Sequence, residues 1–299
     1  MATKDLAAQD VLSDDLTEMI RVAVPERSVR HDLRAASIVW RRELIRFRTD
    51  RLRAITSLVQ PVLFLFVLGT GLSRLASRGL PAGVDFKTFI YPGVLAMSVL
   101  FTSIFSAASI VWDREFGFLR EMLVAPIRRW AIVVGKCLGG ATVATIQGII
   151  FLALAGVANV PYNPVLLLTL VGELLLLSFT LTAFGVMMAA RIKQIQAFMA
   201  LTQLFVLPLF FLSGALYPLN GLPAWLTVLT RIDPLSYIVD PMRHAVFDHL
   251  KVNPVALNSL SPGITWDGWQ VPVALSVALV AVMGLAMLAI AIAEFRKTE

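Results

Sequence analysis

Long runs of residues without a charge constrain this chain more than any other feature of its sequence. Such runs cover residues 54–73, 88–112, 137–172, 194–230 and 271–293. About 20 helical residues, rising ~1.5 Å each, cross the ~30 Å hydrocarbon core of a bilayer. With 58% hydrophobic and 15% charged residues, the chain also lacks the charged surface of a soluble domain. Its natural solvent is therefore lipid.

Two of these runs are too long for a single crossing. A Pro-Tyr-Asn-Pro turn at 161–164 divides the first, and a cluster of prolines and glycines at 208–223 interrupts the second. The sequence therefore predicts an all-α integral membrane protein with six transmembrane helices. Their expected ranges are 54–73, 88–112, 133–158, 165–190, 194–213 and 271–293.

The distribution of basic residues predicts the orientation of these spans. With the N-terminus in the cytoplasm, 20 of the 26 lysines and arginines fall on the cytoplasmic side, as the positive-inside rule requires. Six crossings return the C-terminus to the same side. Residues 1–30 lack the apolar core of a signal peptide, so we expect a polar, flexible cytoplasmic tail, and residues 54–299 form one membrane domain. The basic residues lie beside apolar spans, which argues against nucleic acid as a partner.

Residues 31–53 predict an amphipathic helix before the first span. Apolar side chains recur there at helical spacing, while arginines fall elsewhere on the wheel. The residues that define this interface helix are Trp40, Arg41, Arg42, Leu44 and Phe47, with Leu33 and Ala36 on the same apolar stripe. Two roles are open for it. It is an anchor attracted to anionic lipid on the inner membrane surface, or a docking surface for a cytoplasmic partner.

The loop between the second and third spans predicts a short cytoplasmic helix at residues 113–124. Large apolar residues form one stripe, charged residues lie off it, and Pro126 ends the helix. The stripe consists of Trp112, Phe116, Leu119 and Leu123, and the charged residues are Asp113, Arg114, Arg120 and Glu121. A solvated linker would expose this stripe to water, so contact with another protein is the favoured interpretation.

Residues 214–250, before the last span, predict short helices on the outer side. Pro223 suits the first turn of one helix, and the Asp-Pro pair at 233–234 is typical of the start of another. Both helices are too short to span a bilayer, so we expect re-entrant segments that line a cavity or are covered by protein. Tyr217 and Tyr237 would then belong to a path through the membrane or its gate. An interfacial aromatic belt is the alternative.

Three polar residues inside the predicted spans are further candidates for such a path. Glu173 is a carboxylate about nine residues in from the outer turn. Ionisable groups inside a membrane are costly and tend to be functional or paired. Its place near the outer end leaves contact with water or with a neighbouring subunit open as well. Gln147 and Gln203 are explained equally well by hydrogen bonds between helices.

Motifs of catalysis and of metal binding are absent from the sequence. No G-x-x-x-x-G-K-[ST] phosphate loop occurs, so the chain is not expected to hydrolyse ATP through one. The histidines form no H-E-x-x-H motif, and His244 and His249 are five residues apart rather than four. The single cysteine, Cys137, excludes a multi-cysteine metal site. We therefore expect no catalytic residue, no metal and no cofactor in this chain.

Taken together, these segments resemble the permease subunits of type-2 ABC exporters, above all their daunorubicin and multidrug-export branch. Two motifs carry the resemblance besides the interface helix. One is the loop Trp-Asp-Arg-Glu-Phe-Gly-Phe-Leu-Arg-Glu-Met-Leu-Val-Ala-Pro-Ile at 112–127. The other is Leu-Ser-Gly-Ala-Leu-Tyr-Pro at 212–218, followed by Asp-Pro-Leu-Ser-Tyr at 233–237. The resemblance covers the chain from about residue 30.

The resemblance implies partners and residue roles. Two permeases, here a homodimer, would pair in the membrane and dock on two copies of a separate cytoplasmic ATPase that binds ATP and Mg²⁺. The helix at 113–124 would be the coupling helix, seated in a groove of that ATPase and braced by the helix at 31–53. The coupling residues would be Arg114, Glu115, Phe116, Gly117, Leu119, Arg120, Glu121 and Leu123.

Apolar spans with few charges favour a hydrophobic or amphipathic substrate. Such a drug, polyketide, lipid or glycolipid would leave the cytoplasm or inner leaflet across a bacterial cell membrane. A secondary transporter would show paired midplane charges or related halves, and a channel would show a polar pore lining. Neither pattern is present in the sequence. These two classes remain the alternatives to an ATP-driven exporter.

Overall fold

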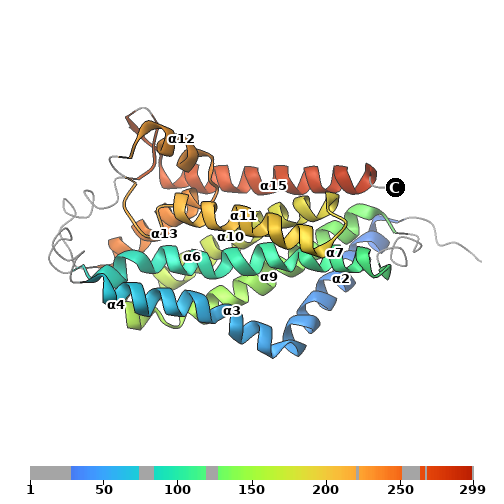
Figure 1. Ribbon diagram of the computed structural model, residues 1–299, viewed down its shortest axis with the longest axis horizontal. Coiled ribbons are helices and arrows are strands. Elements are labelled where there is room, and N and C mark those ends of the chain that lie inside the picture. The colour runs from blue at the N-terminus through green and yellow to red at the C-terminus, as the bar shows by residue number, and fades with distance from the viewer. Residues whose placement is uncertain are drawn as a thin grey trace, which may run out of the picture.

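The computed structural model describes residues 28–73, 84–118, 127–219, 222–250, 263–266 and 268–297. Within these ranges, six helical stretches are long and apolar enough to cross a membrane, and they run side by side as one bundle (Figure 1). The predicted all-α fold with six spans is therefore confirmed. The stretches are Ala54–Gly71, Phe86–Glu115, Arg129–Leu152, Pro164–Arg191, Ile195–Leu212 and Val273–Lys297.

The second and third spans differ from their predicted ranges because both helices continue through charged residues. The second span consists of α6 (Phe86–Ser106) and α7 (Ala108–Glu115), and the third is α9 (Arg129–Leu152). The predicted ranges leave out Lys87 and residues 113–115 of the second span, and the first turn of the third, which begins at Arg129. At its other end α9 is shorter than predicted, because the chain tightens into the 3₁₀ helix η2 (Ala155–Ala158).

The first span contains a change of helix type. It consists of α3 (Arg51–Leu63), the π-helical segment η1 (Phe64–Leu68) and α4 (Gly69–Gly71). Pro61 has no backbone N–H to donate, and the wider π-helical turn follows within one turn of it. The other spans lie close to their predicted ranges. They are α10 (Pro164–Arg191), α11 (Ile195–Leu212) and α15 (Val273–Lys297).

The core of the bundle is formed by α6, α9 and α10. Every residue of α6 from Thr88 to Leu100 is buried, and α15 packs along α10. The spans at the edges are much more exposed. Only 17% of the first span and 22% each of α11 and α15 are buried. Their apolar exposed faces are suited to lipid or to another membrane subunit.

The amphipathic helix predicted before the first span is present as α2 (Val29–Thr49), which ends four residues earlier than expected. Ser28 begins the helix by accepting a hydrogen bond from the backbone N–H of Arg30, and the chain turns at Asp50 into α3. Figure 1 shows the resulting elbow between α2 and α3 standing away from the bundle. We call the end where α2, α7 and the last turn of α15 meet the basic end.

α2 is seated on α9 through a face that the sequence did not predict. The buried residues of this face are Asp32, Ala36, Val39 and Glu43. Leu33 of the predicted apolar stripe is instead 57% exposed. At 100° per residue the buried face lies roughly 70° from the centre of that stripe. The physical reason is the pair of acidic residues, because each carboxylate finds a basic partner on or just before α9.

Two short helices and a hairpin precede α15 at the opposite end. They are α12 (Ala224–Ile232), α13 (Ser236–Asp248) and the antiparallel strands β1 (Thr265–Trp266) and β2 (Trp269–Gln270). α13 begins two residues later than the Asp-Pro pair predicted. Asp233 still caps this turn, because its Oδ1 accepts a hydrogen bond from the backbone N–H of Leu235 at 2.9 Å.

Candidate functional site

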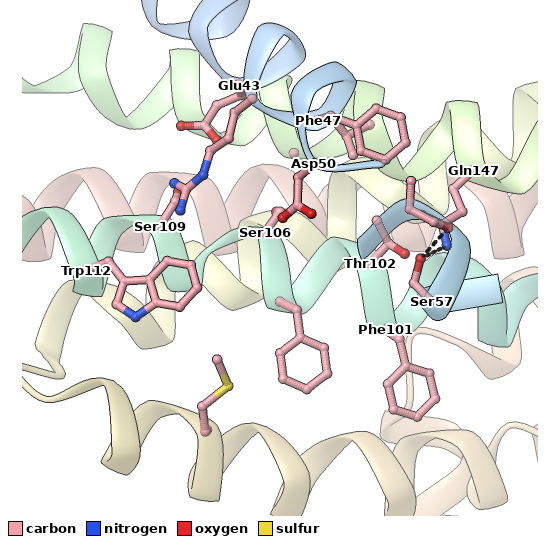
Figure 2. Close-up of a pocket in the computed structure, with 16 residues that line it drawn as sticks. Glu43, Phe47, Asp50, Ser57, Phe101, Thr102, Ser106, Ser109, Trp112 and Gln147 are labelled. Carbon is pink, nitrogen blue, oxygen red and sulfur yellow. Dashed lines mark hydrogen bonds between the residues drawn. The ribbon is translucent and has the colours of Figure 1, made fainter. Parts of the chain in front are cut away.

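A cavity of about 460 Å³ lies near the basic end, between the α2–α3 elbow and the bundle (Figure 2). Side chains of α2, α3, α6, α7 and α9 line it, together with Met199 of α11. The polar lining residues are Glu43, Arg46, Asp50, Ser57, Thr102, Ser106, Ser109 and Gln147. The aromatic lining residues are Phe47, Phe101, Phe105 and Trp112. A lining that mixes aromatic and polar groups suits an amphipathic molecule.

Gln147 offers the cavity an unused hydrogen-bond acceptor. Its side-chain amide donates to the hydroxyl of Ser57, which joins α9 to α3, as the dashed line in Figure 2 shows. Its Oε1 is buried and has no hydrogen-bond partner among the described residues. An unsatisfied buried acceptor costs ~1–3 kcal/mol. A molecule in the cavity that carries an O–H or N–H donor would remove that cost.

Aromatic rings cover the apolar part of the cavity. Phe101 and Phe105 stack with their centroids 6.2 Å apart, and the guanidinium of Arg46 lies 5.2 Å from the centroid of the Trp112 ring. The Arg46 contact holds α2 against α7 by a cation–π interaction. It leaves the cavity with a charged rim and an aromatic interior.

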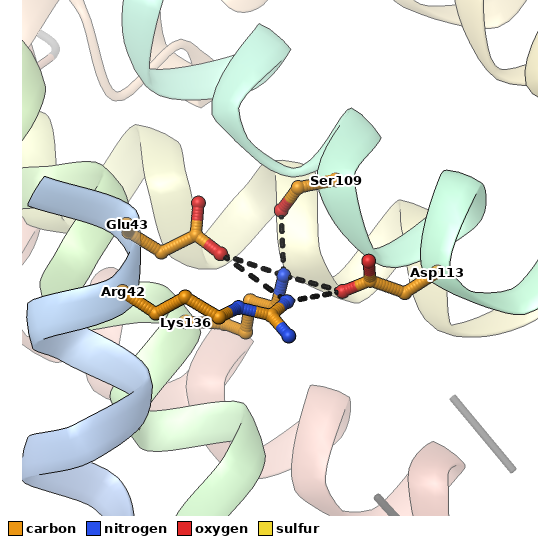
Figure 3. Close-up of polar contacts among 5 residues, drawn as sticks. All are labelled: Arg42, Glu43, Ser109, Asp113 and Lys136. Atoms are coloured by element: carbon orange, nitrogen blue, oxygen red, sulfur yellow. Dashed lines mark hydrogen bonds and ion pairs between the residues drawn. The ribbon is translucent and has the colours of Figure 1, made fainter. Parts of the chain in front are cut away.

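An ion-pair cluster, buried except for the exposed Arg42, lies beside the cavity, and we call it the Lys136 junction. It comprises Arg42, Glu43, Ser109, Asp113 and Lys136 (Figure 3). The Lys136 Nζ lies 2.7 Å from a carboxylate oxygen of Glu43, 2.7 Å from one of Asp113 and 3.0 Å from the Ser109 hydroxyl. Arg42 completes the cluster with an ion pair to Asp113 at 2.6 Å. Two cations thus balance two carboxylates, which is the condition under which buried charges are tolerated.

A second ion pair holds α2 at the start of α9. Asp32 is 1% exposed, and its Oδ1 accepts a hydrogen bond from the backbone N–H of Arg128 at 3.0 Å. The Arg128 guanidinium lies 3.4 Å from the other carboxylate oxygen. The predicted cytoplasmic loop joins Asp113 to Arg128, so α2 binds both of its ends.

Arg114 and Glu115 join the start of this loop to the connection between α10 and α11. Arg114 donates hydrogen bonds to the carbonyls of Ala189, Ala190 and Ile192 at 2.9, 3.0 and 2.6 Å. Glu115 accepts one from the first backbone N–H of α11 at 3.0 Å. These groups satisfy helix-end carbonyls and amides that have no partner within their own helices. Both residues were predicted to contact an ATPase. In the structure their charged groups make hydrogen bonds to the backbone of α10, of α11 and of the connection between them.

The predicted helix at 113–124 does not begin where the sequence suggested. Its first residues, up to Glu115, form the last turn of α7, and Gly117 adopts a left-handed conformation with φ +83°. A side chain at this backbone conformation would be strained, so glycine ends the helix here. Phe116 and Phe118 are 71% and 56% exposed beyond this end. The predicted residues Leu119, Arg120, Glu121 and Leu123 lie outside the described residues.

The predicted interface-helix residues divide among several environments. Arg42 belongs to the Lys136 junction, and Phe47 lines the cavity. The Trp40 indole donates to the Thr142 hydroxyl at 3.0 Å, which adds a contact between α2 and α9. The remaining two differ in exposure: Arg41 is exposed and Leu44 is half-buried.

The other residues predicted for a path through the membrane do not line this cavity. Tyr217 donates to the Phe211 carbonyl at 2.6 Å, and Tyr237 donates to the Arg231 carbonyl at 2.9 Å. Both phenols therefore tie backbone segments together. Gln203 is exposed on α11, and Glu173 is buried in α10 with one oxygen that has no hydrogen-bond partner in the described part of the chain. Only Gln147 of the five predicted path residues reaches the cavity.

Buried charges also organise the opposite end. Burial raises the pKa of Asp233 to about 8. The hydrogen bonds from Leu235 and Ser236 lower this pKa but have the smaller effect. Burial lowers the pKa of Arg243 to about 10, although the nearby Asp240 carboxylate opposes the change. Arg243 lies 4.4 Å from the centroid of the Phe89 ring. Among the described residues, no group of three or more His, Cys, Asp or Glu side chains could hold a metal ion.

Six apolar spans with a cavity among them define a multi-pass membrane protein. The sequence profile of the family described as ABC-2 type transporter matches residues 34–247. The chain belongs to this family. It is the membrane subunit of an ABC exporter and a multi-pass protein of the bacterial inner membrane. The predicted resemblance is confirmed.

Two of three relatives of the chain carry transport names. It is 29% identical over 210 residues to the putative transport permease ycf38 of Cyanophora paradoxa, covering 69% of this chain and 72% of that protein. It is 31% identical over 189 residues to the probable multidrug ABC transporter permease YbhR of Escherichia coli strain K12, covering 60% and 49% of the two chains. Nodulation protein J of Rhizobium leguminosarum bv. trifolii is 29% identical over 217 residues, covering 71% and 80%.

Proposed function

We propose that this subunit docks on a separate cytoplasmic ATPase through the loop that follows α7 and exports a hydrophobic or amphipathic substrate. Two ATPase copies and a second permease, most simply another copy of this chain, complete the transporter. The exposed apolar faces of α3, α11 and α15 are available for the second permease. ATP and Mg²⁺ bind to the ATPase, and this chain supplies the path and the docking surface.

The exposure of Phe116 and Phe118 carries the docking proposal. Both rings lie beyond the end of the second span, at 71% and 56% exposure. The base from which they project is rigid, since Asp113, Arg114 and Glu115 are all bound to other helices. Exposed aromatic side chains on a fixed base are typical of the anchors that fill a partner's pocket.

The chemistry of the cavity supports the choice of substrate. Its aromatic rings would bury the apolar body of an amphiphile, while the acceptor of Gln147 and the rim around Arg46 and Asp50 would bind a polar head. A volume of about 460 Å³ lies within the ~300–1,000 Å³ of typical small-molecule sites. One relative is named a multidrug transporter permease, and a hydrophobic drug is a member of this substrate class.

Copurification tests the docking proposal. A cytoplasmic ABC ATPase from the same organism is coexpressed with the wild type and with Phe116→Asp plus Phe118→Asp, and the bound ATPase is measured after detergent extraction. An interface anchor contributes ~2 kcal/mol or more, so the double variant should lower the affinity by at least about 30-fold. The matched control is Trp269→Asp, an aromatic residue that is 52% exposed at the opposite end.

Two results would contradict the proposal. If the wild type bound no ATPase and exported its substrate without one, the chain would act as a secondary transporter or channel. If the double variant bound the ATPase and stimulated its activity as the wild type does, docking would use another surface.

A further inference from the structure

Lys136 lies between the cavity and the start of the cytoplasmic loop. Two of its partners, Glu43 and Ser109, line the cavity, while Lys136 itself does not. Its third partner, Asp113, stands three residues before the exposed Phe116. One ammonium group therefore touches the wall of the cavity on one side and the base of the loop on the other.

Helix α2 packs closely against α9 at the level of Lys136. A Cβ added at Gly139 of α9 would lie 2.7 Å from the Cβ of Glu43, so the two helices touch at the level of the junction. Lys136 projects from α9 one turn before this point, with a side chain that is 3% exposed. The close approach leaves no space between α2 and α9 at this level.

The energetics of buried charges make the junction move as a unit. Breaking a buried ion pair by removing one partner costs ~3–5 kcal/mol, because the other charge is left unpaired in a medium of low dielectric constant. If α2 moved outward to admit a molecule, Glu43 would pull on Lys136, and Lys136 would pull on Asp113. Moving α2, α7 and α9 together therefore costs less free energy than separating the ion pairs of Lys136.

Two other contacts of α2 and α3 reach only one of the two sites, whereas the Arg46–Trp112 contact, like the junction, joins the cavity lining to α7. The bond from Gln147 to Ser57 lies at the cavity, and the ion pair from Asp32 to Arg128 lies at the far end of the loop. In the described part of the chain, the Lys136 junction touches both the cavity and the start of the loop.

We propose that the Lys136 junction transmits movement between the cavity and the cytoplasmic loop, so that ATP binding by the partner alters the cavity through Lys136. This inference rests on the proposed function, because it assumes an ATPase on the loop. Lys136 acts here as a positioning residue. It orients Glu43 and Ser109 at the cavity wall according to the position of Asp113.

A fluorescent label in the cavity tests the proposal without knowledge of the substrate. Thr102→Cys places a thiol on the lining, and a bimane label there reports on its surroundings. The native Cys137 is buried, so it should not compete for the label. The labelled complex with its ATPase is placed in vesicles of phosphatidylethanolamine and phosphatidylglycerol. Bimane emission is recorded before and after ATP, Mg²⁺ and vanadate trap the closed ATPase.

The main variant removes the junction and keeps its charges balanced. Asp113→Asn with Lys136→Met leaves Arg42 and Glu43 as a pair and leaves every lining residue unchanged. We expect a nucleotide-dependent emission shift in the otherwise wild-type complex and a shift at least about fivefold smaller in this variant, the lower end of typical couplings between sites. Lys136→Arg keeps the charge and should restore most of the shift.

The matched control is the other ion pair between spans at the basic end. Arg191 and Glu294 join α10 to α15 at 2.8 Å and touch neither the cavity nor the loop. Glu294→Gln should therefore leave the emission shift unchanged. A structural disturbance that was general to the basic end would reduce the shift in this control as well.

Each outcome decides between the alternatives. The proposal is overturned if the wild type binds its ATPase but shows no shift, if the charge-balanced variant keeps the full shift, or if that variant folds and no longer binds the ATPase. The last result would make the junction a support for docking. If the charge-balanced variant fails to fold, Asp113→Asn alone carries the test, because it removes the ion pair on the loop side and keeps Lys136 paired with Glu43, and an unchanged shift in it overturns the proposal. Failure of the wild type to bind any ATPase would instead refute the proposed function.

Discussion

The guanidinium of Arg114 donates a hydrogen bond to the carbonyl of Ile192 at 2.6 Å, and so joins the end of the second span to the connection between the fourth and fifth. The same group reaches Ala189 and Ala190. A planar guanidinium presents five N–H donors in a fixed fork, and two of its nitrogens here serve three carbonyls at the end of a helix. One side chain therefore fixes the relative position of α7, α10 and α11 at the basic end.

Replacing Arg114 should loosen this connection. Arg114→Ala leaves three carbonyls without their donor, and a hydrogen bond of a charged group contributes ~1.5–3 kcal/mol net. We expect a lower midpoint of thermal unfolding in detergent, measured by tryptophan fluorescence. Arg114→Lys should recover only part of the loss. Arg41→Ala, at an exposed position on α2, serves as the control and should leave the midpoint unchanged.

The spans were predictable from sequence because the bilayer sets their length, but their ends were not. A search that stops at each charge leaves out Arg129 and Glu115, although both belong to spans in the structure. Each is accommodated by a partner from a distant part of the chain, the carbonyl of Phe295 in one case and the N–H of Ile195 in the other. Partners of this kind depend on tertiary packing, which periodicity does not report.

The residues that line the cavity were even harder to predict from the sequence than the ends of the spans. Gln147 was a candidate because a polar residue inside a span is conspicuous. Trp112, Phe101 and Phe105 were not predicted to share a site with it, since apolar residues on a span are expected everywhere. The face of α2 that seats on α9 was missed for the opposite reason. Glu43 and Asp32 look like solvated charges until their basic partners are located.

The Lys136 junction should be sensitive to the balance of its charges. Lys136→Met leaves two carboxylates with one arginine and should destabilise the protein by ~3–5 kcal/mol. Adding Glu43→Gln removes the surplus negative charge and retains the ion pair between Arg42 and Asp113. We expect the double variant to be more stable than the single one, as measured by thermal unfolding in detergent. Equal or lower stability of the double variant would show that the cluster does not depend on charge balance.

The segment before α15 should respond to pH through Asp233. Its pKa is raised by burial from 3.8 to about 8, so folding favours the protonated carboxyl. The protonated carboxyl therefore stabilises the folded state fully below the pKa of 3.8 expected in the unfolded chain. This stabilisation is lost as the pH rises through about 8. Asn keeps an acceptor oxygen without a charge, so Asp233→Asn should make stability nearly independent of pH in this window.

Tryptophan fluorescence can follow this segment, because the Trp266 indole donates to the Tyr237 hydroxyl at 3.1 Å close by. The unfolding midpoint of the wild type should be lower at about pH 9 than at about pH 6, whereas that of Asp233→Asn should be the same at both. A fall of the same size in both proteins would assign the pH dependence to another group.

The acceptor of Gln147 should select among amphiphiles by their hydrogen-bond donors. Gln147→Leu keeps the approximate volume and removes the buried Oε1, while Ser57 keeps its own bond to the Ala54 carbonyl at 3.0 Å. A donor that loses its acceptor costs ~1–3 kcal/mol, so transport of a donor-bearing dye should fall about fivefold or more. An alkylated analogue without donors should be carried at the wild-type rate or faster, because the variant no longer buries an unsatisfied acceptor. Uptake of the two dyes into inverted vesicles containing the complex measures this ratio. If both dyes lost transport to the same extent, Gln147 would act through the packing of α9 against α3 rather than on the substrate.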